Sequence, residues 1–121
     1  MGSRADLEAA ALAQLELERR AASRDLIAYA QLSWDGYRPA GHHRLIADAL
    51  QRVADGETRR LMLFVPPRHG KSMLASEYFP AQYLGRWPDR DVIAATYAQG
   101  LADDFGRKVR NLLTGTVHQA V

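Results

Sequence analysis

An apolar run that ends in two prolines and a Gly-Lys-Ser triplet most constrains the fold of this chain. Residues 61–65 read Leu-Met-Leu-Phe-Val, a short apolar run typical of a buried strand. Residues 66–72 then read Pro-Pro-Arg-His-Gly-Lys-Ser, and helix-forming residues follow. A strand, a glycine-containing loop, Lys-Ser and a helix start, in that order, are the parts of a phosphate-binding loop.

Each part of this loop has a chemical reason. A helix N-terminus presents unpaired amides and a partial positive charge to an anion. Gly70 lets the backbone approach the phosphate oxygens closely. Lys71 brings a mobile positive charge to those oxygens, and the Ser72 hydroxyl is suited to hold Mg²⁺. The sequence therefore predicts a site for ATP and Mg²⁺.

The loop departs from the general pattern G-x-x-x-x-G-K-[ST] at its first glycine, where this chain has Val65. The two prolines that follow have no N–H to offer a phosphate. The amides of residues 68–72 must therefore form the cradle. The competing interpretation is a polar turn between a strand and a helix, without a ligand, as in any α/β protein.

The loop resembles the deviant Walker A loop of the large terminase subunits of tailed bacteriophages. The resemblance covers about residues 24–113, most of the chain. Several further segments carry it in the right order: residues 33–39, 42–46, 79–90, 96–97 and 101–105. A series of segments in order is more specific than the loop alone.

The resemblance implies an ATPase that drives double-stranded DNA into a procapsid. Its implied partners are DNA, the portal protein and a small terminase subunit. Its implied location is the host bacterial cytoplasm, at the procapsid portal during packaging. The family's loop carries a basic residue that acts as an arginine finger supplied in cis, and Arg68 occupies that position here. Such a charge is worth roughly 10³ to 10⁵ in rate.

The predicted site combines the loop with the side-chain rings of Tyr37 and His43, which precede it in the sequence. The resemblance implies an adenine-contacting segment at this place. Arg68 and Lys71 are the predicted catalytic residues, and Ser72 the predicted Mg²⁺ ligand, whereas His69 is a spacer. The alternative for Arg68 is an ion pair with a surface carboxylate. The alternative for the two rings is helix capping and packing. The predicted nucleotide-binding residues are Pro67, Arg68, His69, Gly70, Lys71, Ser72, Tyr37 and His43.

The expected fold is α/β, a partial RecA-like P-loop NTPase sheet with an α-helical N-terminal lead-in. Residues 1–56 are expected to form the lead-in, and residues 57–121 the first part of the ATPase core. A second apolar run at 92–97 predicts a strand parallel to residues 61–65, since a helix crosses between them. No predicted strand ends in an acidic pair. The Walker B carboxylates and the nuclease domain of the resembled family are therefore expected after residue 121, and residues 1–121 alone are expected to be inactive.

Helical patterns fill much of the remaining sequence. Ser3 is a predicted N-cap for a first helix that runs to about Ala22, and a second helix is predicted over residues 25–32. A third has Gly56 past its end. The helix that starts at Lys71 is expected to end or kink at Pro80. A last helix is indicated by the 3.6-residue spacing of four apolar side chains: Leu101, Phe105, Val109 and Leu112.

Composition excludes several classes of protein. Hydrophobic residues make up 47% of the chain and charged residues 25%, as in an ordinary globular chain. No cysteine occurs, which rules out disulfides and thiolate metal sites. No apolar run is long enough to span a membrane, so a cytoplasmic protein with no membrane partner is expected. The formal net charge of +2 is too small to indicate nucleic-acid binding by itself.

Two other functions remain open from the sequence. One is another P-loop motor, such as a helicase-type ATPase. The other is a module that binds nucleotide, or only a partner subunit, without hydrolysis. An exposed sheet edge would also favour association into a homo-oligomer.

Overall fold

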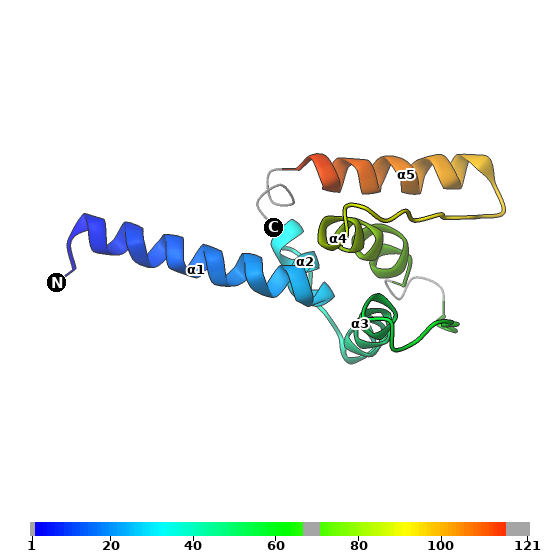
Figure 1. The fold of residues 1–121 in the computed structure, drawn as a ribbon, viewed down its shortest axis with the longest axis horizontal. Coiled ribbons are helices and arrows are strands. Elements are labelled where there is room, and N and C mark those ends of the chain that lie inside the picture. The colour runs from blue at the N-terminus through cyan, green and yellow to red at the C-terminus, as the bar shows by residue number, and fades with distance from the viewer. Residues whose placement is uncertain (1, 67–70, 116–121) are drawn as a thin grey trace.

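The computed structural model describes residues 2–66 and 71–115, and these residues form helices joined by extended segments (Figure 1). The chain of elements is α1 (Arg4–Arg24), α2 (Leu26–Ser33), α3 (Gly41–Ala54), the π-helical η1 (Met73–Tyr78), α4 (Phe79–Arg86) and α5 (Gln99–Thr114). The predicted residues Pro67, Arg68, His69 and Gly70 lie outside the described residues.

The predicted RecA-like sheet is wrong for this structure. Within the described residues there is no strand. Residues 61–65 and 92–96 are extended, but they do not form the backbone hydrogen bonds of a sheet. The apolar runs have the composition of strands, but a strand is stable only when its backbone groups pair with a neighbour in a sheet of sufficient size. Helices satisfy their own backbone, and they form wherever the local pattern suffices.

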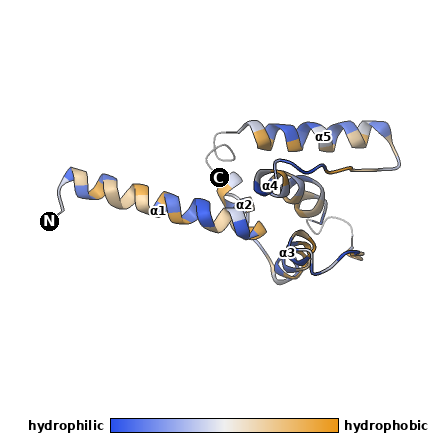
Figure 2. Cartoon of the chain, viewed as in Figure 1, coloured by the Kyte–Doolittle hydropathy of each residue, from blue (hydrophilic) through white to orange (hydrophobic). Residues whose placement is uncertain are grey.

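Helix α1 begins as predicted. Ser3 caps it, with the Ser3 side chain accepting from the Asp6 N–H at 3.2 Å and the Asp6 carboxylate accepting from the Ser3 N–H at 3.0 Å. These hydrogen bonds lower the pKa of Asp6. Most of α1 projects away from the other helices (Figure 1), and polar and apolar residues mix around it (Figure 2). Only its end enters the core, at Ala22.

The core forms where α2 meets the surrounding helices. Asp25 caps α2 by accepting from the Ile27 N–H at 2.9 Å. The fully buried large side chains are Tyr29, Leu26 and Leu74. Since Leu74 belongs to η1 and the other two to α2, the core joins residues from both sides of residue 56.

The other predicted helices are confirmed, with small shifts at their ends. Helix α3 is followed by Gly56 in the left-handed region, at a φ of 81°, the conformation that glycine adopts without strain. Helix α5 packs Val109 and Leu112 against the core. Its Lys108 Nζ lies 3.2 Å from Glu77 of η1. Pro80 does not end its helix, which continues to Arg86. Among the described residues, no helix has the length and apolar character needed to cross a bilayer.

Candidate functional site

Lys71 and Ser72 are the first described residues of a continuous helical stretch, residues 71–86. Ser72 is exposed and Lys71 half-buried. Ser72 has helical dihedral angles, with φ −65° and ψ −38°. A hydroxyl and an ammonium group at a helix start suit an anion and its counter-ion. The rest of the predicted loop, residues 67–70, lies outside the described residues, so the roles predicted for Arg68 and the cradle amides stay predictions.

Buried side chains anchor this helix start to the core. Leu74 is 0% exposed and Tyr78 is 6% exposed. The Tyr78 ring meets Tyr29 edge-on, with centroids 6.2 Å apart, and Tyr37 in the same way at 6.1 Å. Edge-to-face aromatic pairs stabilise a packing by about 0.5–1.5 kcal/mol beyond burial. The helix that carries Lys71 is therefore held against the core at Tyr78 by an aromatic cluster, defined here as Tyr29, Tyr37 and Tyr78.

Burial changes the ionisation of this aromatic cluster. It raises the pKa of Tyr29 to about 12, against a smaller opposite effect of a hydrogen bond with Ser33. Burial also raises the pKa of Tyr37 and of Tyr78. All three phenols stay neutral at physiological pH, and the cluster works as a packed apolar unit with polar tips.

Tyr37 lies inside the protein. It is 4% exposed, and its buried hydroxyl has no hydrogen-bond partner among the described residues. Its ring packs near Trp34, with centroids 6.4 Å apart, and near His43 at 5.9 Å. In this arrangement the Tyr37 face is covered by protein side chains, so stacking on adenine would require Tyr37 to move. Its nucleotide contact stays a prediction.

His43 takes part in the start of α3. Its Nδ1 accepts a hydrogen bond from the Ala40 N–H at 2.8 Å. The neutral ring that makes this bond carries its proton on Nε2. The His42 and His43 rings lie 4.0 Å apart. Helix capping was the alternative to nucleotide binding for His43, and the hydrogen bond to Ala40 is such a cap. The nucleotide contact of His43 stays a prediction.

The second lysine of the chain is engaged elsewhere. Lys108 lies 3.2 Å from Glu77 and 3.3 Å from Asp104, and the hydrogen bond and charge of Glu77 raise the pKa of Lys108. Lys108 is thus held on the surface of α5 by two carboxylates. In the described part of the chain, no group of three or more His, Cys, Asp or Glu side chains is placed to hold a metal ion.

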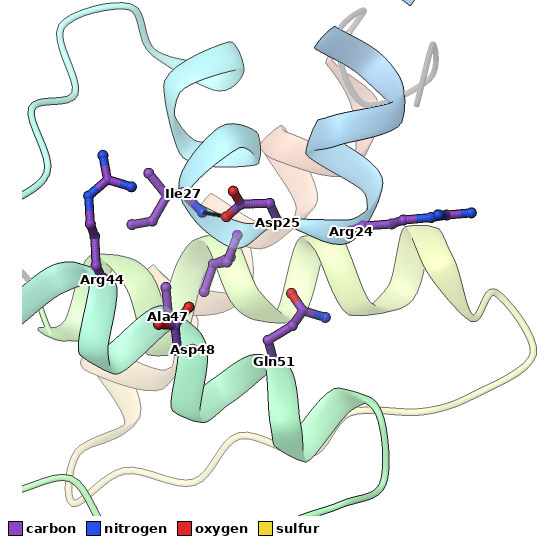
Figure 3. A pocket seen from close by; sticks show the side chains of 8 residues that line it. Arg24, Asp25, Ile27, Arg44, Ala47, Asp48 and Gln51 are labelled. Carbon is purple, nitrogen blue, oxygen red and sulfur yellow. Dashed lines mark hydrogen bonds between the residues drawn. The ribbon is translucent and has the colours of Figure 1, made fainter. Parts of the chain in front are cut away.

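A polar cavity that the sequence did not indicate lies where α1 and α2 meet α3. Its volume is about 200 Å³. Two arginines and two aspartates are among the residues around it. Asp25 is bound to the Ile27 N–H (Figure 3). The residues that line the cavity are Arg24, Asp25, Leu26, Ile27, Arg44, Ala47, Asp48 and Gln51. No local pattern could have revealed it, because its walls come from separate helices.

A larger apolar groove, of about 460 Å³, lies beside the helical stretch that starts at Lys71. The two extended segments run along it, with Leu61 and Leu63 from one and residues 92–96 from the other. Ala75, Ser76, Phe79 and Pro80 form part of its wall. Phe64 and Ile93 of the same segments are strongly exposed, at 89% and 93%.

Comparisons with known proteins found no relative: no family model, no curated protein and no solved structure matches this chain.

Proposed function

We propose that this chain binds Mg-ATP through Lys71 and Ser72, as part of a DNA-packaging motor ATPase of the terminase large-subunit kind. The observation that supports the proposal is the place of Lys71 and Ser72. They are the first described residues of a helical stretch that is anchored by Leu74 and Tyr78, and they follow Pro-Pro-Arg-His-Gly in sequence. A helix start with a mobile cation and an adjacent hydroxyl is the chemistry that triphosphate and Mg²⁺ require.

Each residue has a distinct role in this proposal. The Lys71 ammonium neutralises charge on the β- and γ-phosphate oxygens, and the Ser72 hydroxyl ligates Mg²⁺. Arg68 stabilises the charge that develops as the γ-phosphoryl group transfers. The activity of the motor would be ATP hydrolysis coupled to DNA movement. The partners would be double-stranded DNA, the portal protein and the small terminase subunit, in the cytoplasm of the host.

Lys71→Ala tests nucleotide binding. Mg-ATP carrying a fluorescent group is titrated into the wild-type chain and the variant. We expect the variant to bind at least about tenfold more weakly, a loss of ~1.4 kcal/mol, because the other lysine, Lys108, contacts Glu77 and Asp104 instead. Lys108→Ala is the matched control, and it should bind as wild type does. Equal affinities of wild type and Lys71→Ala would show that this helix start is not a phosphate site.

A further inference from the structure

The helical stretch of residues 71–86 is not an α-helix throughout. Its segment η1, Met73–Tyr78, is π-helical. The Phe79 N–H donates to the carbonyl of Leu74, five residues back, whereas an α-helix would use the carbonyl of Ala75. The helix becomes α-helical again in α4. A π turn of this kind holds one residue more than the α-helical turn it replaces.

Pro80 explains where this π turn lies. A proline has no N–H, so the Ser76 carbonyl lacks the donor that an α-helix would supply from position 80. In an α-helix the proline ring also clashes with that same carbonyl. A wider turn directly before Pro80 relieves the clash, because its carbonyls pair with donors five residues on.

The π turn changes which way the helix start faces. In an uninterrupted α-helix, Lys71, Leu74 and Tyr78 would share one face, because positions seven apart differ by only about 20° around the axis. That face is the buried one, since Leu74 is 0% and Tyr78 6% exposed. One extra residue rotates the helix start by about 100° relative to the rest. In the structure Lys71 is half-buried and Ser72 exposed.

We propose that Pro80 and the π turn Met73–Tyr78 form a positioning element that turns Lys71 and Ser72 away from the apolar core and makes them available to phosphate. This inference rests on the proposed nucleotide binding. Pro80 is a positioning residue, because it acts through the hydrogen-bond register of the helix. The buried contacts of Tyr78 keep that end of the π turn fixed. The hydrogen-bond register of the turn then determines the direction in which Lys71 and Ser72 face.

The register is measured by scalar coupling across hydrogen bonds in solution NMR. In the wild-type chain we expect a coupling between the Phe79 amide nitrogen and the Leu74 carbonyl carbon. Pro80→Ala and Pro80→Val both restore an N–H, and Val also keeps most of the buried volume, so both should move the coupling to Ala75. Pro88→Ala, at an exposed proline after α4, is the matched control and should leave it at Leu74. A wild-type coupling to Ala75, or variants that keep the coupling to Leu74, would overturn the proposal.

The consequence for binding is measured with Mg-ATP on the same proteins. Both Pro80 variants should bind at least ~tenfold more weakly, and Pro88→Ala should bind as wild type does. If Lys71→Ala weakens binding while the Pro80 variants shift the register and bind normally, the positioning role fails and the proposed function stands. If Lys71→Ala binds like wild type, the proposed function fails, and the positioning role fails with it.

Discussion

At the scale of single residues, Gln82 joins distant parts of the chain. It is 5% exposed, and its Nε2 donates to the carbonyl of Ala22 at 2.9 Å, which ties α4 to the end of α1. Gln82→Met keeps the volume but removes the donor and leaves a buried carbonyl unpaired. We expect a loss of ~1–3 kcal/mol in the free energy of unfolding, measured by urea denaturation. Gln99→Met, which removes an exposed bond to Asp103, is the control and should change it by less than ~0.5 kcal/mol. Equal losses in the two variants would contradict the role of Gln82.

At the scale of elements, α1 divides into a free part and a packed part. Residues 4–14 are exposed throughout, and ion pairs such as Arg4–Glu8, at 2.9 Å, lie on the surface. An isolated helix of this length is marginal in water, and exposed ion pairs stabilise it little. Amide hydrogen exchange should therefore be fast over residues 5–14 and slowed by at least ~100-fold over residues 27–30 of α2, which are shielded by the core. Uniform protection along α1 and α2 would show that another contact holds the projecting part.

At the scale of the whole molecule, the two extended segments leave a large apolar surface in water. Phe64 is 89% exposed and Ile93 93% exposed, beside a groove of about 460 Å³. Surfaces of this kind bind apolar dyes and promote association. We expect the chain to enhance anilinonaphthalene sulfonate fluorescence, and Phe64→Lys with Ile93→Lys to reduce that enhancement at least about twofold. Leu12→Lys, at an isolated exposed leucine of α1, is the control and should leave it unchanged. A signal insensitive to the double variant would place the apolar surface elsewhere.

Local chemistry was enough to predict the helices. The capping pair Ser3 and Asp6, the left-handed Gly56 and the apolar spacing in α5 act over one or two turns, so the sequence alone determined these elements. The sequence also predicted that Lys71 and Ser72 are helical, and they are, whereas the predicted loop before them lies outside the described residues.

Only the tertiary structure decided what depends on contacts between distant residues. The apolar runs at 61–65 and 92–97 predicted strands, yet strand pairing needs a neighbour at the right distance, and the described residues supply none. Tyr37 was predicted to meet a nucleotide, and its burial against Tyr78, 41 residues later in the sequence numbering, is invisible to local patterns. The π turn before Pro80 also depends on contacts between distant residues. The proline alone predicts a disturbed helix. The buried contacts of Leu74 and Tyr78 decide that the helix widens and continues where it could have ended.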